Sequence, residues 1–150
     1  MRAWRLARAE HARVLDGRGN RRRGARWNSA GRGVVYASEH ASLAVVELLV
    51  HVDVAEIPSA LSMIEIAVPN NRGVADLSLR DYPPDWRADA EWFRERGDRW
   101  LAEGWALVLR APSVVVPWDL NVMLNPAHPG MAEVRVVGEE PFSFDRRLIA

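Results

Sequence analysis

The sequence predicts a single domain of the α+β class. Apolar runs with the alternation of β-strands outnumber runs with helical spacing, and the two kinds do not alternate regularly along the chain. The chain has 150 residues, of which 49% are hydrophobic, which is enough for one domain with a sizeable core. No internal repeat or linker divides it. We therefore expect residues 1–150 to form one folding unit.

The first part of the chain predicts two strands and one helix. Residues 3–9 alternate weakly and indicate an opening strand, whereas residues 16–24 are rich in Gly and Arg and indicate a loop. Residues 34–37 are β-branched and aromatic, which is typical of a strand. Ser38 is a candidate N-cap for a helix that extends to about Val52.

The rest of the chain predicts more strands and one longer helix. The helix spans about 87–103, and Gly97 within it predicts a break, because glycine is a poor helix former. The expected strands are residues 61–68, 74–79, 106–109, 114–116, 133–137 and 141–144, and residues 121–126 form a short apolar segment that ends at Pro126.

Composition excludes several classes of function. The 20 basic residues, all arginine, balance 20 acidic residues, and a general nucleic-acid binder needs a large positive excess. The absence of cysteine rules out disulfides and thiolate chemistry. The four histidines are scattered, so we expect no metal site. Because the chain has neither a signal-peptide pattern nor a membrane-spanning apolar run, we expect a soluble cytoplasmic protein without membrane contact.

Glu47 is the most unusual residue of the sequence. It lies in the middle of the apolar run Leu43–Val50, which is predicted to be helical. A carboxylate removed from water without a partner is costly, so such a residue has either a cation beside it or a function. Arg26 is a candidate for that cation. The residues alone leave both the structural and the functional interpretation open.

Other polar residues have ordinary structural interpretations. Tyr36 fits an aromatic position of a strand. Ser113 follows Pro112 without the G-x-S-x-G pattern of a nucleophilic serine, and Asn125 before Pro126 is typical of a turn. The four arginines of loop 18–23 are more simply a solvated surface than an anion-binding site.

Taken together, these residues resemble the RES domain family. The resemblance lies in GARWNSAGRGVVYASEHASLAVVELLVH, residues 24–51, and in APSVVVPWDLNVMLNPAHP, residues 111–129. Each motif alone is weak, but their order and short spacings are specific. The family supplies the toxins of bacterial RES–Xre toxin–antitoxin pairs, and the resemblance covers most of the chain.

The resemblance implies a fold and an activity. RES domains are similar to ADP-ribosyltransferases, with a split β-sheet core, a few flanking helices and a cleft that holds NAD. The implied function is a toxin that degrades NAD by hydrolysis or phosphorolysis, with NAD as substrate and no further cofactor. The implied partner is an Xre-type helix-turn-helix antitoxin, which would make any DNA contact. A protein mono-ADP-ribosyltransferase, a non-catalytic antitoxin-binding module and self-association into a homo-oligomer stay open.

The resemblance also implies the residues of the site. The family's central arginine, tyrosine, glutamate and serine fall on Arg26, Tyr36, Glu47 and Ser113, and further recurrent positions fall on Arg5 and Asn125. A carboxylate suits the positive charge that develops on ribose when the nicotinamide bond breaks. Arginine can bind the pyrophosphate of NAD bidentately. In this assignment Tyr36 stacks on the substrate, and Ser113 bonds the nicotinamide amide or positions a neighbouring group.

Overall fold

The computed structural model describes residues 1–150 and contains one sheet of seven strands in the order β4-β5-β6-β2-β1-β3-β7. The strands are β1 (Arg2–Arg8), β2 (Val35–Ser38), β3 (Leu61–Ala67), β4 (Val74–Asp76), β5 (Val108–Pro112), β6 (Leu120–Leu124) and β7 (Arg135–Phe142). The α-helices are α1 (Arg18–Arg21), α2 (Ala41–His51), α3 (Ala90–Glu103) and α4 (Arg146–Ile149), and four short 3₁₀ helices are η1 (Val54–Glu56), η2 (Leu79–Asp81), η3 (Trp86–Ala88) and η4 (Pro129–Glu133). The predicted α+β class is confirmed.

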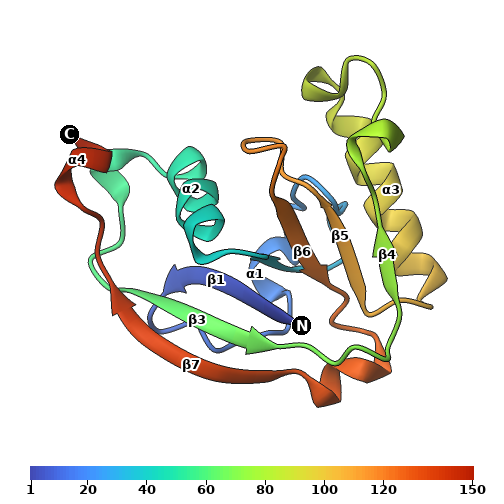
Figure 1. The fold of residues 1–150 in the computed structure, drawn as a ribbon, viewed down its shortest axis with the longest axis horizontal. Helices are drawn as coiled ribbons and strands as arrows, with labels where there is room; N and C mark the ends of the chain where they lie inside the picture. The colour runs from blue at the N-terminus through green and yellow to red at the C-terminus, as the bar shows by residue number, and fades with distance from the viewer.

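The sheet is nearly divided between β1 and β2. These two strands share one residue pair, Trp4 with Ser38, whereas β1 pairs with β3 along its whole length. On one side of the division lie β4, β5, β6 and β2, and on the other lie β1, β3 and β7 (Figure 1). The split-sheet core implied by the family resemblance is therefore confirmed.

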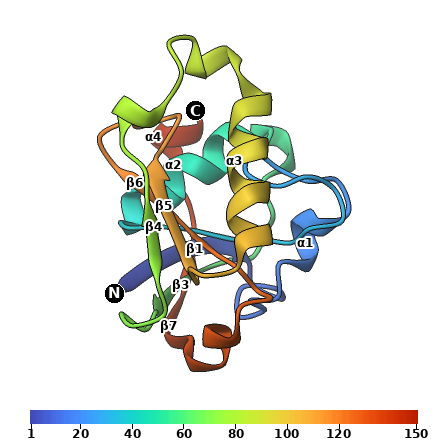
Figure 2. The same cartoon turned by 90° about the vertical axis from the view of Figure 1, so that its right-hand side faces the viewer.

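The two halves are covered by different helices. Helix α3 packs on the four-stranded half, as the view in Figure 2 shows, and its Phe93 and Trp100 join Trp27 and Tyr82 in an aromatic core. Helix α2 lies over β1, where its buried Ala44 packs with Leu6 and Leu61. Because α2 follows β2 directly, it bridges the division between the halves. No helix has both the length and the apolar character needed to cross a membrane.

Two local predictions about the helices were wrong. Ser38 is the buried last residue of β2, and the N-cap position of α2 belongs to His40, which makes no side-chain capping bond. Gly97 does not break α3, which is continuous from Ala90 to Glu103. A Cβ at Gly97 would lie 1.7 Å from the carbonyl oxygen of Trp27. This glycine is thus a packing residue that lets the chain around Trp27 approach the helix.

Several boundaries also differ from the prediction. Residues 114–116 form the turn between β5 and β6 instead of a strand, because the side chain of Ser113 binds the backbone of that turn. The two expected C-terminal strands are a single strand, β7, with an irregularity in its pairing to β3 between Glu65 and Ile66. The Arg-rich segment predicted as a loop contains the one-turn helix α1.

Candidate active site

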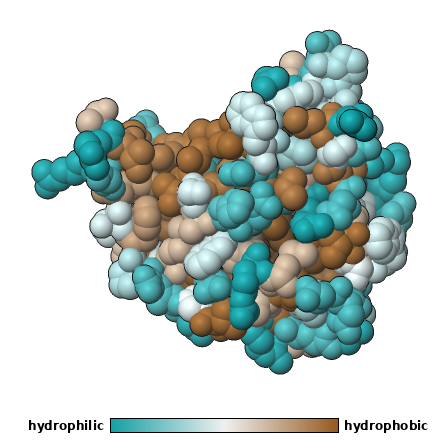
Figure 3. All heavy atoms as spheres, in the orientation of Figure 1, coloured by the Kyte–Doolittle hydropathy of each residue, from teal (hydrophilic) through white to brown (hydrophobic).

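A cavity of about 640 Å³ lies where the two halves of the sheet meet. Its walls come from β1, β2, α2, the segment around Arg26 and the turn after β5. Hydrophobic residues gather on the surface over α2 and toward the β5–β6 hairpin, so the cavity is set in largely apolar surroundings (Figure 3). Of the six site residues predicted from the sequence, the structure places Arg5, Arg26, Tyr36 and Glu47 in the cavity wall.

Glu47 projects from α2 and is half-buried. Its Oε1 accepts a hydrogen bond of 2.6 Å from Ser113 Oγ and one of 3.0 Å from Asn121 Nδ2. No cation pairs with it, so the hypothesis that Arg26 neutralises Glu47 was wrong. Its Oε2 has no protein partner, and every buried side-chain oxygen of the structure has one. Oε2 is therefore open to solvent, on a side chain that lines the cavity.

Ser113 is fully buried directly after β5. Its Oγ accepts hydrogen bonds from the backbone N–H groups of Val115 and Val116, both at 3.0 Å. A hydroxyl has a single proton to donate, and in Ser113 this proton goes to Glu47. Of the two roles considered from the sequence, this geometry favours positioning a neighbouring group over direct contact with nicotinamide.

Tyr36 is held by a small network of hydrogen bonds. Its hydroxyl donates to Asn28 Oδ1 at 2.6 Å and accepts from the backbone N–H of Trp27 at 3.0 Å. Burial raises the pKa of the Tyr36 hydroxyl well above its usual range, so the group stays neutral. Asn28 is itself completely buried and donates to the carbonyl oxygen of Arg32 at 2.5 Å. The ring of Tyr36 is thereby fixed in the cavity wall.

Arg26 is exposed and has no carboxylate partner. Its guanidinium carbon lies 5.2 Å from the centre of the Phe93 ring, a cation–π contact that stabilises the positive charge of Arg26. The residues around it are fixed, because Trp27 is buried and Ser29 donates its backbone N–H to Asp98 of α3 at 2.9 Å. The charge of Arg26 is thus held in place and free for a ligand.

Arg5 brings a second positive charge to the cavity from β1. Its Nη1 donates to the carbonyl oxygens of Val14 at 2.7 Å and Ala12 at 3.3 Å. Burial lowers the pKa of the Arg5 guanidinium, and the nearby Asp16 opposes this shift. An arginine nevertheless stays protonated in proteins. With two arginines and one glutamate, the cavity is suited to an anionic ligand.

The remaining predicted residues lie elsewhere. Asn125 is buried after β6 and its Oδ1 accepts from the N–H of Ala127 at 3.0 Å, which is the ordinary role of a turn asparagine. It is not part of the cavity wall. The arginines of segment 18–23 are exposed, and Arg18 lies 3.5 Å from Asp16.

The sequence interpretation missed two asparagines of the site. Asn121 lies in the cavity wall and binds Glu47, and Asn28 fixes Tyr36. A signal was present for each. Asn121 is the one polar residue inside the strand Leu120–Leu124, and Asn28 is the last residue of the motif Arg26-Trp27-Asn28. An amide among apolar strand residues needs a hydrogen-bond partner.

One group of side chains outside the cavity has potential metal-ligand atoms within 4.8 Å of one another: Glu39, His40 and Asp119. The Nδ1 atom of His40 lies 3.8 Å from a carboxylate oxygen of each acidic residue. Glu39 Oε1 also accepts the backbone N–H of Leu120 at 2.7 Å. These contacts account for the cluster as a link between the start of α2 and the start of β6.

The fold and the site together define a split-sheet α+β domain with a charged cleft at the split. Comparison with known proteins agrees with this class. The model of the RES domain matches residues 2–145, and the chain belongs to the RES domain family.

Relatives and a solved structure support the assignment. "Toxin Res" of Pseudomonas putida is 36% identical over 136 residues, which covers 89% of this chain and 92% of the relative. The "Prs ADP-ribosylating toxin" of a Sphingobium strain is 31% identical over 153 residues, with 97% and 95% covered. A chain in the crystal structure of the M. tuberculosis MbcT–MbcA toxin–antitoxin complex superposes with a TM-score of 0.70 at 17% identity, covering 99% of this chain and 86% of that one. At this identity the superposition shows the shared fold.

Proposed function

We propose that this chain is the toxin of a toxin–antitoxin pair and cleaves the nicotinamide–ribose bond of NAD. One observation carries the proposal: Glu47 lines the cavity with one oxygen fixed by neutral donors and the other free. Burying part of a carboxylate without a cation beside it is costly, and ionisable groups in such settings cluster at functional sites. The names of the relatives from Pseudomonas and Sphingobium point to the same class of protein.

Glu47 would act on the ribose. Breaking the nicotinamide–ribose bond builds positive charge on the sugar, and a fixed carboxylate stabilises that charge best in a site poor in water. The free Oε2 of Glu47 is the atom suited to this role, since Oε1 already accepts two hydrogen bonds. With substrate in the cavity, the apolar residues of the wall would limit the access of water to the bond that breaks.

Arg26 and Arg5 would hold the rest of the substrate. The pyrophosphate of NAD carries two negative charges, and guanidinium groups bind phosphate oxygens in pairs. Arg26 has its whole guanidinium available, whereas Arg5 has one nitrogen engaged with the backbone. The fixed ring of Tyr36 offers a stacking surface for nicotinamide.

The proposed partner is an antitoxin with an Xre-type helix-turn-helix domain. The structural neighbour was solved as a toxin–antitoxin complex, and relatives carry the name of a toxin. A toxin that consumes NAD in the cytoplasm needs such an inhibitor, and the cleft is the surface it would block. DNA binding would then belong to the antitoxin, in agreement with the zero net charge of this chain.

The acceptor of ADP-ribose distinguishes the candidate reactions. Water would give ADP-ribose, and inorganic phosphate would give its 1-phosphate. A second candidate function, transfer of ADP-ribose to a protein, is favoured by the name of the Sphingobium relative. All three reactions break the same bond, so the roles of Glu47 and Arg26 are common to them.

The test is an incubation of the purified chain with adenylate-labelled NAD, in buffer, in buffer with phosphate, and with cell extract. Loss of NAD with soluble labelled products supports degradation, and the phosphate dependence identifies the acceptor. A labelled protein band supports transfer. The Glu47→Gln variant controls for contaminating enzymes, because the amide keeps the shape of the side chain and removes its charge.

The proposal is rejected if the wild-type chain neither consumes NAD nor binds it in calorimetry. That result would favour a non-catalytic module that only binds an antitoxin. Equal turnover by wild type and Glu47→Gln would remove Glu47 from the mechanism if Arg26→Ala, purified in the same way, loses activity, and would indicate a contaminating enzyme if it does not.

A further inference from the structure

Asn121 occupies a special place in the sheet. It lies in β6 and pairs with Ser38 of β2, and Ser38 makes the single pair with Trp4 of β1 that joins the two halves. Directly paired residues in adjacent strands present their side chains on the same face. Asn121 and Ser38 both line the cavity, beneath the helix that carries Glu47.

The amide of Asn121 is committed to Glu47 on one side only. Its Nδ2 donates to Glu47 Oε1 at 3.0 Å, the same oxygen that accepts from Ser113 at 2.6 Å. The orientation of the amide follows from chemistry, because its carbonyl oxygen would repel the carboxylate. The Oδ1 of Asn121 has no protein partner and is accessible, since no buried side-chain oxygen lacks one.

Two hydrogen-bond donors to Glu47 Oε1 fix the orientation of the carboxylate better than one donor does. A single hydrogen bond from Ser113 leaves the carboxylate free to turn about it, whereas a second donor on another strand defines the plane of the group. The two hydrogen bonds also take the place of the missing cation as partners of the carboxylate. The two donors lie on either side of the turn of the β5–β6 hairpin, so this end of the hairpin presents Glu47 to the cavity.

We propose that Asn121 is a positioning residue that, together with Ser113, fixes the plane of the Glu47 carboxylate and turns its free oxygen toward the cavity. Asn121 is not one of the RES motif residues, which are Arg26, Tyr36, Glu47 and Ser113. The kinetic consequence rests on the proposed NAD cleavage, but the hydrogen bond from Asn121 to Glu47 does not.

The charged and titratable neighbours of Glu47 are known from the cavity wall. Arg5 faces the cavity from β1, Arg26 from the preceding segment, Tyr36 from β2 and His51 from the end of α2. The ring of His51 contacts the backbone oxygen of Glu47 through Nδ1 at 2.7 Å. None of these four residues is substituted in the variants below, so a difference between the variants in the titration of Glu47 reports the substitution at Asn121.

The first experiment follows the side-chain carboxyl of Glu47 by carbon NMR across pH, with the signal assigned by its loss in Glu47→Gln. Removing one donor to a charged group, in Asn121→Ala, raises the titration midpoint by about one pH unit. In Asn121→Asp, two adjacent carboxylates share a proton, and the upper midpoint of the pair rises by about two units or more. The control Asn71→Asp changes an exposed asparagine and leaves the midpoint where it is.

An unchanged midpoint in Asn121→Ala and Asn121→Asp, with thermal melting like that of wild type, overturns the proposal. A variant that does not fold is replaced by Asn121→Ser, which keeps a donor on a shorter side chain and should shift the midpoint less than alanine does. The titration needs no substrate, so it tests the role of Asn121 even if the chain does not cleave NAD.

The second experiment measures NAD turnover. Asn121→Ala lowers kcat about tenfold. The dissociation constant of NAD is measured in the inactive Glu47→Gln background, with and without Asn121→Ala, and differs less than threefold between the two. In Asn121→Asp the proton shared by the two carboxyl groups takes the place of the missing donor. This proton is lost at high pH, so the activity of the variant falls there, whereas the activity of wild type stays level. A loss confined to NAD affinity, with kcat and its pH profile unchanged, contradicts a positioning role.

Discussion

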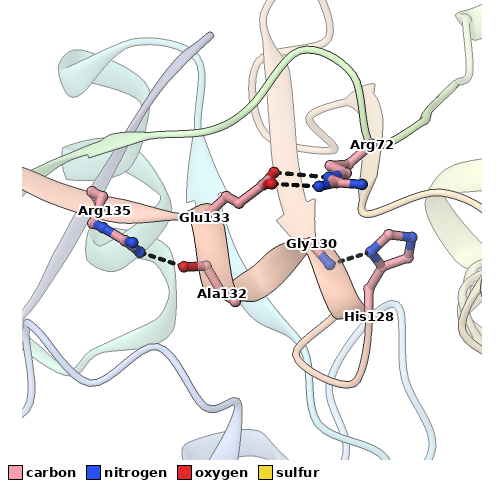
Figure 4. Close-up of polar contacts among 6 residues, drawn as sticks. All are labelled: Arg72, His128, Gly130, Ala132, Glu133 and Arg135. Atoms are coloured by element: carbon pink, nitrogen blue, oxygen red, sulfur yellow. Dashed lines mark hydrogen bonds and ion pairs between the residues drawn. The ribbon is translucent and has the colours of Figure 1, made fainter.

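Glu47 and Glu133 are two carboxylates that the same chain holds in opposite ways. Glu133 forms a two-pronged ion pair with Arg72, in which Arg72 Nε donates to Oε2 at 2.7 Å and Nη2 donates to Oε1 (Figure 4). Both oxygens of Glu133 are thus taken by one cation. Glu47 has no cation, and two neutral donors hold only one of its oxygens.

The difference separates a structural carboxylate from one available for chemistry. The Arg72–Glu133 pair joins the turn after β3 to η4 near the surface, and the pair of Arg110 with Asp76 joins β5 to β4 in the same two-pronged manner. Arginine is abundant in this chain, yet it does not reach Glu47. In these two links both carboxylate oxygens are satisfied, whereas in the cavity one oxygen of Glu47 is left free.

The largest expected difference comes from removing the negative charge of each carboxylate in turn. Glu47→Gln lowers NAD turnover by a factor on the order of 10²–10³, because it removes charge stabilisation in the transition state. Its thermal melting changes little, since the amide can keep the two hydrogen bonds. Glu133→Gln leaves turnover unchanged, because the side chain lies outside the cavity. If both variants lose activity equally, the two carboxylates do not differ as described.

A smaller loss is expected when one donor to Glu47 is removed. Ser113→Ala leaves the N–H groups of Val115 and Val116 without their acceptor, and the loss of a hydrogen bond costs about 0.5–1.5 kcal/mol. We expect a lower free energy of unfolding in urea and turnover reduced about tenfold. Ser113→Thr keeps the hydroxyl and serves as the comparison. Full activity in Ser113→Ala would show that Glu47 does not need this donor.

The free cation of the cavity gives the third prediction. Arg26→Ala weakens NAD binding about tenfold or more, because it removes charge-assisted hydrogen bonds to the pyrophosphate. Arg22→Ala, an exposed arginine four positions earlier, leaves the affinity unchanged. Calorimetry on both variants measures the difference. Equal affinities would mean that Arg26 serves the structure through Phe93 alone.

The smallest effect concerns pH. The hydrogen bonds from Arg72 hold the pKa of Glu133 below its usual range. A lowered pKa in the folded state contributes stability above the pKa of the unfolded chain, about 4.5, and this contribution is lost as the pH falls through the folded value. Wild type should therefore lose slightly more of its melting temperature than Glu133→Gln on acidification below pH 4.5. High salt should reduce the difference, since the pair is exposed.

Much of the fold was predictable because its signals are local. Alternating apolar residues identified β1 and β3, and the apolar run after Tyr36 identified α2. The failures came from tertiary contacts: Gly97 looks like a helix breaker, but the close approach of Trp27 requires it. Residues 114–116 look like a strand, but the hydroxyl of Ser113 makes them a turn.

The site was predictable in part for the same reason. The motif order identified Arg26, Tyr36 and Glu47, which do line one cavity, and also Ser113, which supports Glu47 from behind. Asn125 carries a motif position as well, yet its side chain is used in its own turn.

By itself the sequence determined the α+β class, the family and the unusual position of Glu47 in an apolar helix. Only the tertiary structure decided what holds that carboxylate. Ser113 and Asn121 reach Glu47 across 66 and 74 positions of the chain, and the cation expected beside it is absent. Hydrogen bonds over such separations depend on how the two halves of the sheet meet, and periodicity within one segment carries no information about that meeting.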